Sequence, residues 1–96
     1  MAKTYDLLEK ALADLRGIWN YTEDRWGEQQ ADTFYRDIIK TFEHLATAER
    51  QGRKSDVREG YLKFPAGRHF VCFTKGDGKI KVVRVLHGSL DVDRHL

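Results

Sequence analysis

The chain has 96 residues, of which 41% are hydrophobic and 33% are charged, and its net charge is +2. This size predicts one domain over residues 1–96 and leaves no room for a second core. Two Trp, four Tyr and five Phe supply enough apolar surface for one two-layer core, which argues against disorder. No apolar run approaches the roughly 20 residues of a membrane span, and the first residues lack an apolar signal segment, so we expect a cytoplasmic protein.

The distribution of charge and the cysteine content limit which partners and which cellular compartment are expected. Residues 1–47 hold six Lys/Arg and nine Asp/Glu, whereas residues 48–96 hold eleven and six. The second half could therefore face an acidic partner, such as a nucleic acid or an acidic protein segment, or could form a solvated surface. The single cysteine, Cys72, cannot form an internal disulfide, and its apolar neighbours in sequence predict a small buried hydrophobic residue.

The first half of the chain predicts a strand and two helices. Tyr5 to Leu8 is a short strand candidate. A helix is expected over residues 9–25 and a second over 28–47, because apolar residues recur at helical spacing in both. The two stripes are Leu12, Leu15, Trp19, Thr22 and Trp26, and then Ala31, Phe34, Ile38, Phe42 and Leu45, with Tyr35 and Ile39 beside the second. Gly27 can end the first helix with a positive φ, so the short connection predicts an antiparallel helical hairpin.

The second half predicts a charged loop and three strands. Residues 48–60 contain almost nothing to bury, and strands are expected over 61–64, 68–75 and 79–86. Turns of hairpin length separate these strands, at 65–67 and 76–78, so they should form an antiparallel meander. The order β-α-α-β-β-β predicts an α+β fold in which the helical hairpin packs on one face of an antiparallel sheet.

Few residues in the chain suggest chemistry. The four histidines, His44, His69, His87 and His95, lack metal-ligand spacing, and there is no phosphate-binding glycine loop, so neither a metal nor a cofactor is expected. One enzymatic hypothesis remains, a metal-independent ribonuclease in which Arg84 supplies a cation and His87 an acid or base. Further phosphate contacts could come from Arg50, Arg53, Lys54 and Arg58.

Two further side-chain roles stay open. Arg84 follows Ile80 and Val82 at spacing two and precedes Leu86, so these four residues are expected to share one face of a strand. This alternation does not say whether the Arg84 guanidinium is paired or catalytic. Core packing is the default expectation for Trp19 and Trp26, although Trp26 lies at the hairpin tip, where an exposed Trp would anchor a partner.

Four stretches, in this order and spacing, resemble the ParE toxins, the gyrase-directed branch of the RelE/ParE toxin superfamily. The first helix of the family is similar to Ala13-Asp14-Leu15 followed by Ile18-Trp19-Asn20-Tyr21-Thr22, and its hairpin tip to Arg25-Trp26-Gly27. The loop resembles Gly52-Arg53 with Asp56-Val57-Arg58-Glu59-Gly60. The end resembles Val83-Arg84-Val85-Leu86-His87 with Asp91-Val92-Asp93-Arg94-His95-Leu96. One departure is Leu8-Glu9, where the family often has Ser-Pro or Thr-Pro as a helix start.

The resemblance implies the toxin of a type II toxin–antitoxin pair, which inhibits DNA gyrase and is neutralised by direct binding of a ParD-like antitoxin. Such a toxin is a binding inhibitor rather than an enzyme, and no sequence-specific DNA binding by this chain alone is expected. The alternative is a RelE-like mRNA endoribonuclease. That branch has a tyrosine near the C-terminus and catalytic lysines, whereas no Tyr follows Tyr61 here and the loop has only Lys54.

Candidate residues follow for both partners. For toxicity and target binding they are Arg84, His87, Asp91, Arg94 and His95. For antitoxin binding they are Arg53, Arg58, Arg84 and Trp26. An acidic antitoxin segment that folds on binding would place its carboxylates near the arginines. The C-terminal tail could instead cover the sheet edge, since Leu90, Val92 and Leu96 are evenly spaced.

Overall fold

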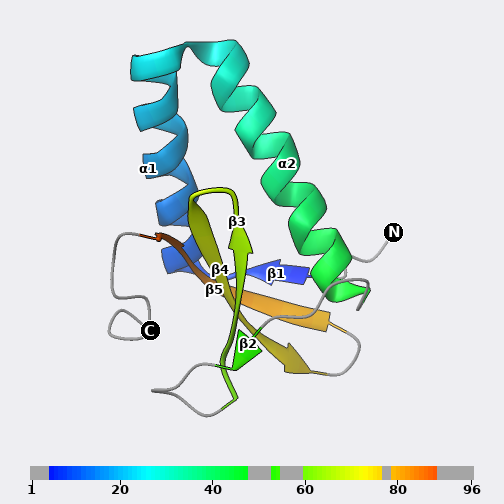
Figure 1. Cartoon of the computed structure of the whole chain (residues 1–96). Coiled ribbons are helices and arrows are strands. Elements are labelled where there is room, and N and C mark those ends of the chain that lie inside the picture. Colours follow the sequence, from blue (N-terminus) through cyan, green and yellow to red (C-terminus); the bar gives the residue numbers. More distant parts are fainter. Residues whose placement is uncertain (1–4, 48–52, 55–59, 77–78, 89–96) are drawn as a thin grey trace.

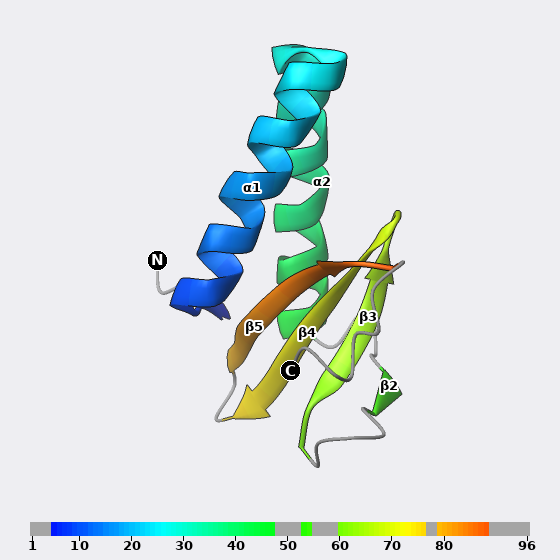
Figure 2. The same ribbon diagram turned by 90° about the vertical axis from the view of Figure 1, so that its left-hand side faces the viewer.

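A computed structural model describes residues 5–47, 53–54, 60–76 and 79–88. Two helices lie on one side of a sheet, and the hairpin that they form projects past the strands (Figures 1 and 2). The described elements are β1 (Tyr5–Leu7), α1 (Glu9–Trp26), α2 (Glu28–Ala46), β2 (Arg53–Lys54), β3 (Leu62–Ala66), β4 (His69–Gly76) and β5 (Lys79–His87). This is the predicted α+β order, with one additional strand.

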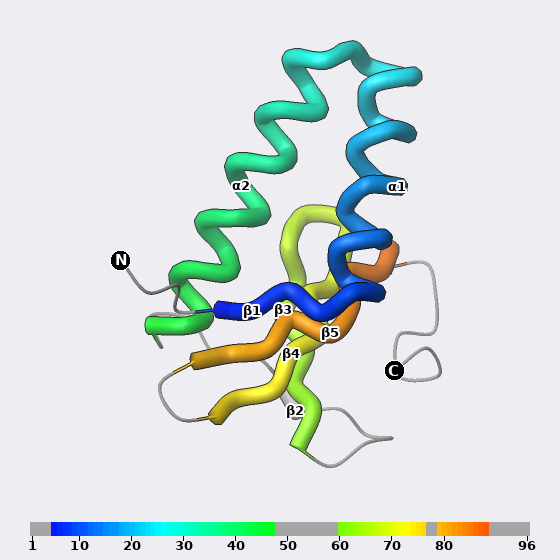
Figure 3. Tube along the Cα trace, turned by 180° about the vertical axis from the view of Figure 1, so that it is seen from behind, coloured from blue at the N-terminus to red at the C-terminus, as the bar shows by residue number. Residues whose placement is uncertain are grey.

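The sheet is mixed, because its first strand runs parallel to its last. Its strand order is β1-β5-β4-β3-β2, and β3, β4 and β5 form the predicted antiparallel meander. β1 lies at the end of the sheet and pairs parallel with β5, Tyr5 opposite Ile80 and Leu7 opposite Val82 (Figure 3). The expectation of a purely antiparallel sheet was therefore wrong for β1, since three residues of alternating burial carry no information on pairing direction.

Two strands also differ from the predicted boundaries. A two-residue strand, β2, lies inside the segment expected to be a loop, and it pairs with Leu62 and Lys63 of β3. β3 continues through Pro65 to Ala66, so the turn to β4 falls at Gly67, whose φ is 62°. Proline is tolerated there because none of the described residues pairs with Pro65 on the β2 side of β3, where a missing N–H costs no ladder hydrogen bond.

The helical hairpin turns at one residue. Gly27 is both the C-cap of α1 and the N-cap of α2, with φ 92° and ψ 168°. Its N–H donates to the carbonyl of Glu23 and its own carbonyl accepts from Ala31. The positive φ was predicted, and it requires glycine because a side chain would be strained in this conformation. Leu8 caps α1 without a side-chain hydrogen bond, consistent with the missing start signal. Neither described helix combines the length and apolar character of a membrane span.

The main core lies between the helices and the sheet. Its buried members are Ala11, Leu15, Ile38, Phe42, Leu45, Val71, Phe73, Ile80, Val82 and Val85. The predicted stripe of α2 is confirmed, since four of its members are buried and Phe34 packs against them. The predicted stripe of α1 was partly wrong. Ala11, Leu15 and Ile18 face the core, whereas Leu12 and Trp26 are exposed, because the hairpin extends beyond the sheet and no described element packs on its outer side.

Candidate functional site

A carboxylate from α1 occupies the edge of β5 beyond the end of β1. β1 stops at Leu7, and the N–H of Leu8 donates to the Val82 carbonyl. Further along the same edge, Asp14 Oδ2 accepts a hydrogen bond of 3.0 Å from the Val85 N–H. The side chain of Asp14 therefore replaces the strand partner that β5 lacks at this position.

The same carboxylate binds the guanidinium of Arg84. Nε of Arg84 donates to Oδ2 of Asp14 at 2.7 Å, and Nη2 donates to Oδ1 at 2.9 Å. The two side chains are 23% and 16% exposed, so water screens this bidentate pair only in part. The hydrogen bonds to Asp14 raise the pKa of Arg84 above its ordinary value. Of the two open interpretations of Arg84, the paired one is confirmed.

A β-bulge separates Arg84 from the residues expected on its face. Phe73 pairs with Val82, but the next residue along β4, Cys72, pairs with Arg84, so Val83 is extra. Ile80 and Val82 belong to the core under the helices, whereas Leu86 belongs to a second cluster with Cys72. The prediction that Arg84, Ile80, Val82 and Leu86 share one face was therefore wrong, because a bulge shifts the alternation by one residue. The expectation that Cys72 is buried is confirmed.

His87 ends β5 directly opposite His69 of β4. The two imidazole rings are 5.2 Å apart between centroids, edge to face, and Phe34 of α2 lies 5.4 Å from the His69 ring. Burial lowers the pKa of His69, and the neighbouring His87 lowers it further. Because β5 alternates after the bulge, Arg84 and His87 belong to opposite faces of the sheet. The structure therefore does not bring together the cation and the acid or base of the ribonuclease hypothesis.

The outer side of the helical hairpin presents an apolar surface that the sequence did not predict. Leu12, Leu15 and Trp19 of α1 and Tyr35 of α2 line a pocket whose polar members are Arg16, Asn20 and Asp32. We call this set of residues the hairpin groove. Leu12 is 38% exposed and Tyr35 is 45% exposed. Leu8 and Trp26 extend the same side of α1, since positions 8, 12, 19 and 26 fall on one helical stripe.

One feature of the sequence could have indicated this surface. α1 has apolar residues over more than one narrow face, with Ala11, Leu15 and Ile18 beside the stripe of Leu12 and Trp19. A helix that is apolar over so wide an arc has either two neighbours or one uncovered side. Trp26 at the tip is the extreme case, since it is 70% exposed although core packing was its default expectation. Tyr21, also exposed, lies under the Arg25 guanidinium at 5.1 Å and does not line the groove.

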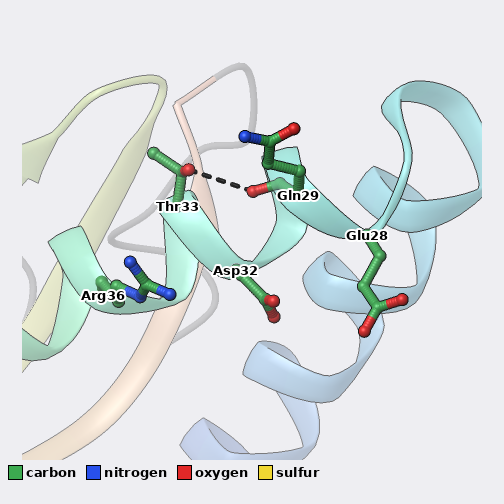
Figure 4. Close-up of a pocket in the computed structure, with 5 residues that line it drawn as sticks. All are labelled: Glu28, Gln29, Asp32, Thr33 and Arg36. Carbon is green, nitrogen blue, oxygen red and sulfur yellow. Dashed lines mark hydrogen bonds between the residues drawn. The ribbon is translucent and has the colours of Figure 1, made fainter.

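A second pocket is polar and lies along the first turns of α2. It is lined by Glu28, Gln29, Asp32, Thr33 and Arg36. In Figure 4 the Glu28 and Asp32 carboxylates lie on one side of the helix, and Thr33 and Gln29 lie on the other. The Thr33 hydroxyl donates to the Gln29 carbonyl at 3.0 Å, so it is already used within the helix. Residues from successive turns of one helix do not enclose a ligand.

Several candidate residues lie outside what the structure describes. Arg58, Asp91, Arg94 and His95 are in this group, as are Arg50 and the remainder of the tail. Arg53 and Lys54 are described only as the backbone of β2. Among the described residues, no group of three or more His, Cys, Asp or Glu side chains is arranged to hold a metal ion.

A comparison with known protein families decides the class of this chain. Residues 5–92 match the family described as the ParE toxin of the type II toxin–antitoxin system parDE. The chain belongs to the ParE toxin family. It is 43% identical over 98 residues to Toxin ParE1 of Mycobacterium tuberculosis, with both chains covered completely. It is 37% identical over 95 residues to Toxin ParE1 of Caulobacter vibrioides, covering 98% of each. Toxin ParE of Escherichia coli is 34% identical over 92% of this chain and 87% of the relative.

The ParE fold is also seen in a solved structure entitled "Chromosomal ParDE TA system from P. aeruginosa". That chain superimposes with a TM-score of 0.75, covers 88% of this chain and 94% of its own length, and is 20% identical. The similarity confirms the α+β fold. The protein is thus a toxin of the ParE family, and this family implies an antitoxin partner.

Proposed function

We propose that this ParE-family toxin inhibits DNA gyrase in the cytoplasm and is neutralised by direct binding of a ParD-like antitoxin. The hairpin groove is the observation that supports the antitoxin half of the proposal. An antitoxin segment that folds on binding must bury apolar side chains to compensate for its loss of entropy. Leu12, Trp19 and Tyr35 offer such a surface on the outside of the domain, and Trp26 offers an exposed anchor next to it.

The charges around the groove suggest what the antitoxin segment looks like. Arg16 and Asp32 lie among the groove residues, so an amphipathic helix with charges of both signs fits there. Acidic residues elsewhere in the segment would meet Arg53 and Arg58, since the second half of the chain is basic. Arg84 is a weaker candidate for antitoxin binding than Arg53 and Arg58, since its guanidinium is already paired with the Asp14 carboxylate.

The antitoxin proposal is tested by mutating the groove. Changing Leu12 and Tyr35 together to alanine should weaken the complex at least about thirtyfold, because each loses a buried anchor worth roughly 1–2 kcal/mol at an interface. Tyr21→Ala is the matched control, an exposed aromatic on the same helix but outside the groove lining. Titration calorimetry would measure the affinity of the antitoxin for the unmodified toxin, for the double variant and for the control. Equal losses in the double variant and in the control would reject the groove as the docking site.

The target is tested separately, in cells and with purified gyrase. Expression without the antitoxin should trap gyrase–DNA breaks and induce a DNA-damage response, whereas cut messenger RNA would show the RelE-like alternative instead. Changing Arg94 and His95 to alanine should reduce growth inhibition with little change in melting temperature, since arginine forms strong charge-assisted hydrogen bonds with a target. Full toxicity of that variant would refute a role of the tail. Lost toxicity with a collapsed melting temperature would assign the tail to the fold.

A further inference from the structure

Charge is segregated between the two layers of the domain. The described strands carry seven Lys/Arg and one Asp, whereas the two helices carry five Lys/Arg and eight Asp/Glu. The helices cover one face of the sheet (Figure 2). The other face therefore holds the side chains that alternate with the core residues of each strand.

Three lysines belong to that opposite face. Ile80 and Val82 are buried beneath the helices, so Lys79 and Lys81, which alternate with them on β5, point to the other side. The same holds for Lys63 of β3, because both of its neighbours in sequence pack against the core. We call Lys63, Lys79 and Lys81 the outer lysine face.

The lysines of β5 are available for a partner. Lys79 and Lys81 are exposed, and neither forms an ion pair with another residue that the structure describes. Asp6 of β1 is the register neighbour of Lys81 and is the one acidic residue of the described strands. Successive outward residues of a strand stand about 7 Å apart, so the two ammonium groups can contact separate charges of an extended polyanion.

The apolar residues of this face distinguish between two kinds of polyanion. Cys72 and Leu86 belong to the same side as the lysines, but they are 0% and 3% exposed. The exposed large hydrophobic side chains among the described residues are those of Leu8, Leu12, Tyr21, Trp26 and Tyr35, and all lie on the helices or at the start of α1. An acidic peptide that folds on binding needs exposed apolar anchors, whereas a phosphate backbone needs only cations.

We propose that the outer lysine face binds the phosphate backbone of a nucleic acid without reading its sequence. This site is distinct from the hairpin groove and does not depend on the identity of the toxin's target. Contacts of this kind release counterions, so the logarithm of the affinity falls by about 0.9 per phosphate for each unit of log salt on duplex DNA. Two lysine contacts then predict an affinity loss of about tenfold between 50 and 200 mM salt.

The experiment is a fluorescence anisotropy titration of the full chain at 50, 100 and 200 mM salt. The probes are labelled duplex DNA, single-stranded DNA and an RNA hairpin of unrelated sequences, which distinguish the sources of phosphate, together with poly-glutamate. Changing Lys79 and Lys81 together to glutamate should raise the Kd for the preferred nucleic acid at least tenfold at 50 mM salt and lower the salt slope by about two. Because glutamate beside Asp6 adds a like charge, the double glutamine variant is measured too, and circular dichroism confirms folding.

The matched control changes Lys10 and Lys40 to glutamate. Both are exposed on the helices, so this variant has the same net charge as the Lys79 and Lys81 double glutamate variant but keeps the outer lysine face intact. Its affinity for the nucleic acid should stay within about twofold to threefold of that of the unmodified protein. The proposal is overturned by an equal loss in the control, by unchanged binding in the folded glutamine variant, or by the absence of binding to every nucleic acid at 50 mM salt. Equal or tighter binding of poly-glutamate would overturn it in favour of an acidic protein partner.

Discussion

Removing the Asp14 carboxylate tests how strongly the contact between α1 and β5 stabilises the domain. Asp14→Ala deletes two hydrogen bonds to Arg84, at 2.7 and 2.9 Å, and one to the Val85 N–H, at 3.0 Å. An exposed ion pair contributes about 0.2–1 kcal/mol, and breaking a buried one costs about 3–5 kcal/mol. With side chains 23% and 16% exposed, this pair lies between the two limits.

We therefore expect Asp14→Ala to lower the free energy of unfolding by about 2–3 kcal/mol. For a domain of this length such a loss corresponds to a melting temperature lower by roughly 10–20 °C. Chemical denaturation in urea, followed by circular dichroism, measures the free energy directly. Asp24→Ala is the control, an exposed aspartate of the same helix with the same gain in helix propensity, and its effect should stay within about 0.5 kcal/mol.

A double-mutant cycle separates the ion pair from the backbone contact. Arg84→Met removes the cation but leaves Asp14 to accept from Val85, so the coupling energy between the two substitutions should be about 1–2 kcal/mol. If Asp14→Ala were no more destabilising than Asp24→Ala, the carboxylate would not be stabilising the β5 edge, and the explanation given for this contact would be wrong.

Three further predictions concern the helix start, the core and pH. Leu8→Ser should stabilise the protein by about 1 kcal/mol in urea denaturation, because it supplies the missing N-cap acceptor of α1; a loss of stability would contradict this. Phe42→Ala should cost about 3–5 kcal/mol, since the ring is fully buried between helix and sheet; a cost below about 1 kcal/mol would refute its place in the core. Burial and His87 lower the pKa of His69 below 6.5, so the unfolded chain takes up the proton first. The protein should therefore be most stable above pH 6.5 and lose stability as the pH decreases below this value. His69→Gln should make the difference in melting temperature between pH 7.5 and pH 5 smaller, and an unchanged difference in the variant would contradict the prediction.

The elements of this domain could be predicted because they depend on local periodicity. The stripe of Ile38, Phe42 and Leu45 specifies α2 and its buried face without knowledge of the rest of the chain. The same method failed for α1, where Leu12 and Leu15 look alike in sequence but differ in burial. Their difference depends on where the sheet ends beneath the hairpin, which is a property of the assembled fold rather than of the helix.

The contacts of the candidate site depend on pairing between distant segments. Asp14 and Arg84 are separated by 70 residues, and no local pattern connects them. The bulge at Val83 lies in a strand that has no glycine to mark it, so alternation alone placed Arg84 on the wrong face. The resemblance gave the correct family but no information on which side chains meet.

The two proposed binding surfaces have a geometric consequence for neutralisation. The hairpin groove lies on the helices, and the outer lysine face lies on the side of the sheet that the helices do not cover. A segment of antitoxin bound in the groove therefore leaves Lys79 and Lys81 exposed, and an isolated segment of this kind should not displace a nucleic acid from the toxin. If such a segment did release the bound probe, the two surfaces would be coupled, either through a change in the sheet or through direct competition by the rest of the segment. Because the groove residues and the lysines are on separate layers, the affinity of the segment for the toxin distinguishes these two causes. Only direct competition by the acidic part of the segment predicts that the groove variant and the lysine variant both weaken binding of the segment itself.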